Sequence, residues 1–390
     1  MTDLDRADTG RPHGIRTGKP ASDPAARARH TGDPLADAVV AAMRAAAPER
    51  ARELRTELDR GIRHGLASLD DPAPESAALL RSAESLPPDT DPALLDTGAL
   101  PLFTSPPAVH TLSLSAGALL RTYGSPSIAV LLGTTGRLVD GAARRITETG
   151  RWVLCATLPG GLRPGAPGYV ATLQVRMLHA HMRALARSRG HDEARHGVPI
   201  NQIDLARTWL DFTLVSLRAE AAIGFDLTDD EITQVYAYWR VLAHQLGIDP
   251  ELVGGVTDHT SAARLDALVS RATGPPGPES RVLAGALVGA VAALLHGSLR
   301  LPEPVGRRLL QVLARRFHGP VVADALGMRR CVPLDLLVGV AAWIVRARRA
   351  RMRCTPGAVA ARHERYVAVT RAIVDGDATG PALFQNFRPS

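Results

Sequence analysis

The spacing of apolar residues is the feature that most restricts the fold of this 390-residue chain. Leu35, Val39, Val40 and Met43 recur at i, i+4, i+5 and i+8, which places them on one face of a helix. Helical patterns follow one another from about residue 93 to residue 375, and no segment of useful length alternates as a strand does. The pattern predicts an all-α protein.

Composition supports a helical core in one large domain. Aromatic residues are only 4% of the chain, so Ala, Leu and Val must fill the core, which favours helices over a β-sandwich. Residues 1–35 are rich in Gly, Pro, Asp, Arg and Thr without a hydrophobic period, and predict a disordered N-terminal tail. We expect a single helical-bundle domain over residues 36–380 and a short C-terminal tail at 381–390.

Two apolar runs bear on the question of a membrane. Val282–Leu295 and Leu336–Val345 are both shorter than the roughly 18–20 residues that span a bilayer, so they predict buried core helices and no stable membrane span. The N-terminus lacks the apolar stretch of an export signal. Three cysteines without close spacing fit a reducing compartment, and we therefore expect a cytoplasmic protein.

The basic residues exclude several kinds of chemistry. All but one of the 46 Lys and Arg residues are arginine, and the one lysine, Lys19, lies in the predicted tail. A lysine Schiff base and a P-loop are thereby excluded, and no Rossmann, HExxH or GxSxG motif is present. The arginine run 346–353 could contact nucleic acid or anionic lipid. Because no aromatic residues are interleaved with it, a solvated helix end is favoured and no nucleic-acid partner is expected.

Two histidines lie close together on a predicted helix. Leu173, Met177 and Ala180 form its apolar stripe. Residues two positions apart on a helix point about 200° apart, so His179 and His181 cannot bind one ion together. The spacing argues against a two-histidine zinc site. His179 remains either a core histidine with its hydrogen bonds satisfied or a single ligand.

Five sequence blocks occur in an order that resembles a known family. The blocks are Leu100–Phe103 to Tyr123–Pro126, Thr135–Leu138 with Arg144–Thr149, Val175–Arg183, Gly197–Asp204 with Thr208 and Phe212, and Tyr238–Trp239 with Leu246–Ile248. Together they cover about residues 95–255. The ordered set resembles the MpaB-type oxygenases, whose catalytic domain is shared with the latex clearing protein, a rubber oxygenase.

The resemblance implies that the helical bundle encloses a b-type haem. His179 falls on the histidine of the family's Arg-x-x-His-Ala-x-x-Arg motif, the proximal ligand of the iron. Arg145 and Thr149 fall on the family's catalytic pair, and their i, i+4 spacing puts them on one helix face. The guanidinium of Arg145 suits a haem propionate or an oxygen species, and the Thr149 hydroxyl can donate a hydrogen bond. Arg145 could instead form a surface ion pair, and Arg144 is its natural rival.

The arginines beside His179 have two possible roles. Arg176 and Arg183 lie at i−3 and i+4 from His179. The resemblance makes both candidates for binding the haem propionates, and structural ion pairs are the alternative.

The chain departs from the rubber oxygenases at two positions. The glutamate proposed as a base in polyisoprene cleavage falls on Ala129, and the lysine that is a distal haem ligand in one such enzyme falls on Glu148. The resemblance therefore implies an oxygenase that uses dioxygen or peroxide on a smaller hydrophobic or alkene-containing molecule, as a tailoring enzyme of secondary metabolism. The alternatives are oxidative C=C cleavage of polyisoprene-like substrates and a non-catalytic haem-binding or sensing protein.

Overall fold

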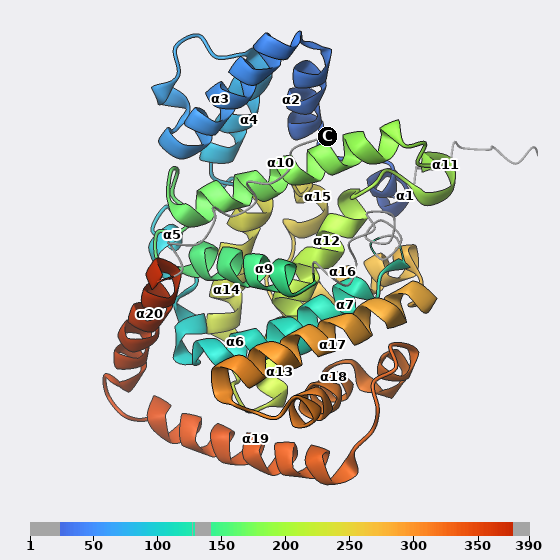
Figure 1. The fold of residues 1–390 in the computed structure, drawn as a ribbon. Helices are drawn as coiled ribbons and strands as arrows, with labels where there is room; N and C mark the ends of the chain where they lie inside the picture. Colours follow the sequence, from blue (N-terminus) through green and yellow to red (C-terminus); the bar gives the residue numbers. More distant parts are fainter. Residues whose placement is uncertain (1–23, 127, 129–141, 377–390) are drawn as a thin grey trace, which may run out of the picture.

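The computed structural model describes residues 24–126, 128 and 142–376, and within these ranges every regular element is a helix (Figure 1). The all-α prediction is confirmed. The predicted enclosure of a haem stays a prediction.

The α-helices are α1 (Pro24–Arg29), α2 (Pro34–Ala45), α3 (Pro48–His64), α4 (Pro74–Glu84), α5 (Leu94–Thr97), α6 (Pro107–Ser113), α7 (Leu120–Tyr123), α9 (Ala142–Thr157), α10 (Pro167–Ser188), α11 (Glu193–His196), α12 (Gln202–Leu210), α13 (Ser216–Ala222), α14 (Asp229–Gln245), α15 (Pro250–Val253), α16 (His259–Thr273), α17 (Pro278–Leu299), α18 (Glu303–Ala325), α19 (Val332–Arg353) and α20 (Ala358–Gly376). Two 3₁₀ turns, η1 (Leu66–Ser68) and η2 (Leu100–Thr104), and two π turns, η3 (Leu114–Leu119) and η4 (Asp211–Val215), complete the described elements.

Helix α10 separates two hydrophobic cores. It crosses beneath the small lobe of α2, α3 and α4, and the larger bundle lies on its other side (Figure 1). Tyr169, Leu173 and Met177 of α10 join the small core of that lobe. Ala171 and Val175 belong with the main core. The helix therefore has two apolar faces, and each side chain's position on the helix decides which core it enters.

Helix starts follow the local chemistry of capping. Thr228 Oγ1 accepts a hydrogen bond from Glu231 N at 3.3 Å, and Glu231 Oε2 accepts one from Thr228 N at 2.8 Å, so the two residues form a capping box at the start of α14. Asn201 caps α12 in the same way, by accepting from the backbone N–H groups of Ile203 and Asp204.

The disordered tail predicted for residues 1–35 includes residues that are ordered in the structure. Residues 24–29 form α1, which packs against α12 and α16, and Asp33 is buried as the N-cap of α2. The segment shows no strong hydrophobic period because its apolar contact with the main core is made by two small residues, Ala25 and Ala28, while Asp33 is held by polar contacts. The rest of that tail and the C-terminal tail at 381–390 lie outside the described residues.

One of the two predicted core helices is not in the core. The run Val282–Leu295 lies on α17 and buries Leu283, Leu287 and Val291, as predicted. Among the described residues, α17 is also the helix whose length and composition would allow a membrane span, a test that core helices of soluble proteins also pass. The run Leu336–Val345 lies on α19 and buries only Ala342, so that prediction is wrong. Its neighbours cover α19 on one side only.

Candidate functional site

The predicted site residues lie on a hairpin of two helices, α9 and α10. Their contact is close because Gly168 lies against the end of α9, where a Cβ atom would be 2.5 Å from the carbonyl oxygens of Cys155 and Gly161. Trp152 Nε1 donates a hydrogen bond to Thr172 Oγ1 at 3.0 Å. A short connection joins the two helices, so they run antiparallel (Figure 1).

The register of this hairpin brings the predicted residues to one level. Both helices rise by about 1.5 Å per residue, so equal steps from the Trp152–Thr172 contact stay level with each other. Three residues back along α9 and three forward along α10 place Thr149 beside Val175. Four further residues on each helix place Arg145 level with His179. The helix positions that carry the i, i+4 pair thus run alongside the stretch of α10 that ends at His179.

His179 continues the face of α10 that belongs to the main core. It lies one turn beyond Val175, which packs against that core. Its Nδ1 atom is buried and has no hydrogen-bond partner among the described residues. Burial lowers the pKa of His179 to about 4, and the nearby Arg183 cation adds to the shift. The imidazole is therefore neutral at physiological pH and has a lone pair available for a ligand.

His181 lies on the other side of the same helix. It follows Met177 by one turn, and Met177 belongs to the core of the small lobe. The predicted divergence of the two histidines is confirmed, and only His179 faces the main core.

The structure shows which of the neighbouring arginines Arg144 and Arg145 of α9 forms a surface ion pair. Arg144 Nε donates to Glu148 Oε1 at 2.7 Å, and the Arg144 side chain is exposed, so Arg144 forms the surface ion pair. Arg145 belongs to α9, but its side chain lies outside the described residues. Thr149 is half-buried one turn further along. The catalytic roles of Arg145 and Thr149 stay predictions.

Arg176 and Arg183 make ion pairs within the protein. Arg176 donates to both carboxylate oxygens of Asp33, at 2.6 and 3.0 Å, and the two side chains are almost fully buried. Arg183 Nε donates to Asp37 Oδ1 at 2.7 Å. These are the structural ion pairs that the sequence left as the alternative. Contact of either arginine with a haem propionate stays a prediction.

Three of the five sequence blocks meet at the Arg176–Asp33 pair. The third block supplies Arg176. The fourth supplies Gln202, which donates to the carbonyl oxygens of Gly32 and Gly247 at 2.7 and 2.9 Å. The fifth supplies Gly247, where a Cβ atom would lie 2.3 Å from Asp33 Oδ2 and where φ is +74°. Residues from these three blocks therefore form a buried junction that positions α10 and do not face the hairpin.

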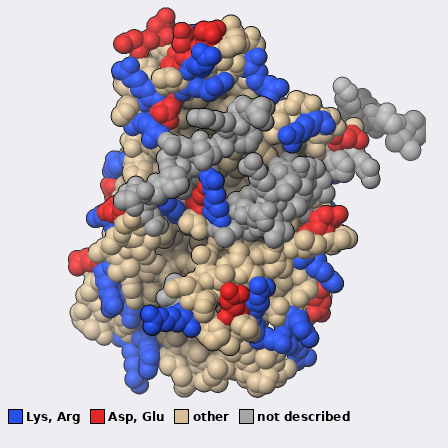
Figure 2. Space-filling view, in the orientation of Figure 1, with Lys and Arg blue, Asp and Glu red and all other residues tan. Residues whose placement is uncertain are grey.

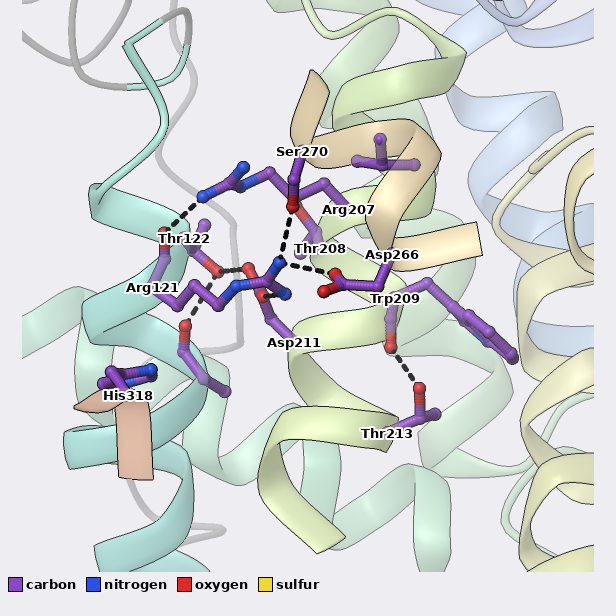
Figure 3. A network of polar contacts seen from close by, with 12 residues as sticks. Arg121, Thr122, Arg207, Thr208, Trp209, Asp211, Thr213, Asp266, Ser270 and His318 are labelled. Carbon is purple, nitrogen blue, oxygen red and sulfur yellow. Dashed lines mark hydrogen bonds and ion pairs between the residues drawn. The ribbon is translucent and has the colours of Figure 1, made fainter. Parts of the chain in front are cut away.

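A second buried cluster of charges lies between α7, α12, η4 and α16 (Figure 3). Asp211 is fully buried and accepts hydrogen bonds from Arg121 and from the Thr122 hydroxyl, both at 2.7 Å. Arg121 also binds Asp266. Arg207 donates to Thr273 Oγ1 at 2.6 Å and to the backbone oxygen of Arg121 at 3.2 Å.

In this cluster, the opposite charges of two arginines and two carboxylates offset the cost of burying each charge. Burial raises the pKa of Asp211, and Arg121 and Arg207 oppose that shift. Burial also works against the charge of Arg121, but Asp211 and Asp266 outweigh it and raise its pKa. The pairing fixes η4, whose Phe212 packs edge-on against Trp152 at 5.5 Å. Through this contact with Trp152 of α9, the cluster helps to position the α9–α10 hairpin.

The π turn η3 is held by a histidine from α18. His318 Nε2 donates a hydrogen bond to the backbone oxygen of Ala116 at 3.0 Å. Burial lowers the pKa of His318 to about 4, so the ring is neutral. Next to it, Gly319 has φ of +75° and kinks α18. Both η3 and η4 are π turns, which are wider than α-helical turns and are often found near functional sites.

Comparison with known proteins agrees with this arrangement. Residues 105–350 match the family model described as "ER-bound oxygenase mpaB/B'/Rubber oxygenase, catalytic domain". The chain belongs to this family. Its fold is similar to that of latex clearing protein in the closed state, with a TM-score of 0.66 and 20% identity over 89% of this chain and 90% of that one. A search of curated proteins finds no match.

Members of the mpaB/rubber oxygenase family are in general haem-dependent. The residues of the hairpin fit such a group, because His179 is neutral, its Nδ1 is unpartnered, and its face of α10 is apolar. No three His, Cys, Asp or Glu side chains of the described residues are grouped to hold a metal ion. A haem iron takes four ligands from the porphyrin and needs only one from the chain.

Two cavities of the described residues lie away from the predicted site residues. One is apolar and lies between η3, α17 and α18, lined by Ala116, Leu287 and Val291 among others. A second lies between α17 and α18 and includes Arg281 and Arg307.

Sequence reasoning missed the charged cluster of Figure 3 and the aspartates that bind α10. A signal was present for one of them: Asp211 is a single carboxylate within the apolar stretch Trp209–Leu214. A lone charge in an apolar helix needs a buried partner. The partners themselves come from segments far away in the chain, which spacing cannot identify.

Proposed function

We propose that this protein is a haem b-dependent oxygenase that uses His179 as the ligand of the iron. Its substrate is a hydrophobic or alkene-containing small molecule, and its oxidant is dioxygen or peroxide. Family membership supports the oxygenase activity. The site assignment is supported by the hairpin register, in which the neutral His179, with its buried Nδ1, is level with position 145 and one turn beyond the level of Thr149.

Each residue of the hairpin has a separate part in this proposal. Haem, when bound, supplies the oxidative chemistry that side chains cannot perform. Burial keeps the His179 imidazole neutral, so that its lone pair can bind the iron. Arg145 supplies a permanent cation for a propionate or a reacting oxygen, and the Thr149 hydroxyl donates a hydrogen bond beside it. Val175 and its apolar neighbours exclude water from this face.

The substrate assignment rests on the departures from the rubber oxygenases. Glu148, at the position of the distal lysine, is engaged with Arg144 at the surface of α9. Ala129 lies outside the described residues. We therefore propose a substrate smaller than polyisoprene and retain oxidative C=C cleavage of polyisoprene-like molecules as the alternative. The role in secondary metabolism and the cytoplasmic location stay predictions from the sequence.

An absorption spectrum tests the cofactor assignment. The purified protein, expressed with adequate haem, should show a Soret band, and His179→Ala should lose it. His181→Ala is the matched control, because His181 lies on the same helix but faces the small lobe, and it should retain the band. A haem-free wild-type protein, or equal retention in both variants, would overturn the assignment.

Dioxygen consumption with a panel of hydrophobic alkenes tests the catalytic pair. Thr149→Val and Arg145→Ala should keep haem but lower the turnover by about 100-fold, the size of effect seen when a charge-stabilising donor is removed. Arg144→Ala should leave turnover unchanged, because that side chain forms a surface ion pair. A haem-loaded wild-type protein that consumes no dioxygen with any alkene would support the non-catalytic alternative.

A further inference from the structure

Helix α19 has an exposed apolar face. Five of its large side chains, Leu336, Leu337, Val340, Trp343 and Ile344, are between 38% and 69% exposed. They recur at i, i+1, i+4, i+7 and i+8, so they share one side of the helix. Scattered exposed apolar residues are normal, but a contiguous group on one helix marks an interaction surface.

The opposite side of α19 fastens the helix to the protein. Arg349 is buried and donates to the backbone oxygen of Thr104 at 2.8 Å. Arg346 binds Asp226, and Arg353 binds Glu231, both at 2.7 Å. The exposed side is therefore fixed in orientation, at the lower edge of the molecule in Figure 1.

Positive charge lies at both ends of the apolar face. Arg348 and Arg351 follow Ile344 by one and two turns on the same side, and both are exposed. Arg329 and Arg330 are exposed just before the helix begins. None of these four forms an ion pair with another described residue. In Figure 2 this lower edge is tan with basic groups toward its two sides.

Negative charge is almost missing from the same face. The only carboxylate within α19 is Asp335, and Arg316 binds it at 2.9 Å. Pairing two copies through α19 would bring arginines together in either direction. An antiparallel pair would set Arg348 and Arg351 against Arg329 and Arg330, and a parallel pair would set each arginine against its own copy. Charge therefore disfavours a second copy as the occupant.

We propose that α19 docks flat on the surface of an anionic lipid bilayer. The apolar side chains enter the boundary between headgroups and acyl chains, and Trp343 has the amphipathic ring that is favoured at that depth. The arginines at both ends extend their charged groups to lipid phosphates. Five arginines in the last turns prevent α19 from crossing the bilayer.

Trp343 provides a direct test without any substitution. It is 69% exposed, whereas Trp152, Trp209 and Trp239 are at most 6% exposed. Adding vesicles of phosphatidylcholine with phosphatidylglycerol to the full chain should shift the tryptophan emission to shorter wavelength and carry the protein into the vesicle pellet. Vesicles of phosphatidylcholine alone should bind more weakly, and added salt should reduce the difference between the two.

Variants separate this surface from the rest of the molecule. Leu337→Ser with Ile344→Ser should weaken vesicle binding at least about tenfold, because two large apolar side chains no longer enter the bilayer. Arg348→Ser with Arg351→Ser should remove most of the preference for anionic vesicles. The control, Val369→Ser with Ile373→Ser, changes two exposed apolar side chains of α20 and should bind as the wild type does.

Three results would overturn the proposal. The first is an unchanged Trp343 emission with anionic vesicles. The second is equal weakening by the α20 control. The third is a dimer, measured by light scattering, that Leu337→Ser with Ile344→Ser dissociates while vesicle binding is absent, since that result would assign the face to a second copy.

Discussion

Helices α17 and α19 are alike in sequence but differ in their surroundings. Each has 22 residues, a proline near its start and a long apolar run. Helix α17 packs against α18, α9, α7 and η3, and buries apolar residues along its length. Helix α19 packs against α18 and α20 near the edge of the molecule and buries Ala342 and Arg349 (Figure 1). An apolar run therefore predicts a helix, while the number of neighbours decides its burial.

The largest expected difference between the two helices is in folding stability. Leu287 of α17 is 1% exposed, so Leu287→Ala should lower the free energy of unfolding by about 2–5 kcal/mol. Leu337 of α19 is 63% exposed, and Leu337→Ala should change it by less than about 0.5 kcal/mol. Urea unfolding followed by circular dichroism measures both. Equal losses would mean that α19 is covered in solution.

The next effect concerns α18, which lies between the two helices (Figure 1). The pKa of His318 is 6.5 when unfolded and about 4 when folded. As pH falls, His318 is protonated in the unfolded chain at a higher pH than in the folded chain. The free energy of unfolding therefore decreases as pH falls from 6.5 towards 4. From pH 7.5 to pH 5 this loss is about 2 kcal/mol.

His318→Gln tests that pH dependence. The glutamine amide can still donate to the Ala116 carbonyl but does not titrate. Urea midpoints at pH 7.5 and pH 5 should therefore differ less in the variant than in the wild type. If both proteins lose the same stability between pH 7.5 and pH 5, the loss must come from other groups. One such group is His179, whose pKa is similarly lowered.

An effect of similar size to that of His318 concerns the attachment of α19. Arg349 donates to Thr104 and to the backbone oxygen of Asp226, and Arg349→Ala should cost about 1–3 kcal/mol of stability. Its exposed neighbour provides the control, since Arg348→Ala should be nearly neutral. Hydrogen exchange of α19 amides should quicken only in the first variant. Faster exchange in both would show that α19 is held by charge in general.

Local sequence pattern was enough to predict most of the helices and part of the candidate site. Hydrophobic period predicted the helix that carries Val39, Val40 and Met43 (α2) and the helix that carries His179 (α10), because this signal acts over one or two turns. The spacing of His179 and His181 also predicted that the two rings diverge. Local pattern could not predict the π turns, which depend on contacts such as that of His318 with Ala116.

Partners distant in sequence are the part that pattern could not supply. Arg176 is 143 residues from Asp33, and Arg121 is 90 residues from Asp211. Many arginines and carboxylates of this chain have equivalent local settings, so no spacing selects one pair. Burial selects it, because an unpaired charge in the core costs far more than one at the surface.

The sequence by itself determined an all-α chain, its family blocks and the position of one candidate iron ligand, because helical period and motif order are properties of neighbouring residues. Only the tertiary structure decided which apolar helix is covered, which arginines are occupied and which residues of α9 stand level with His179. Those outcomes depend on contacts between helices, and the same apolar run is buried in α17 and exposed in α19 for that reason.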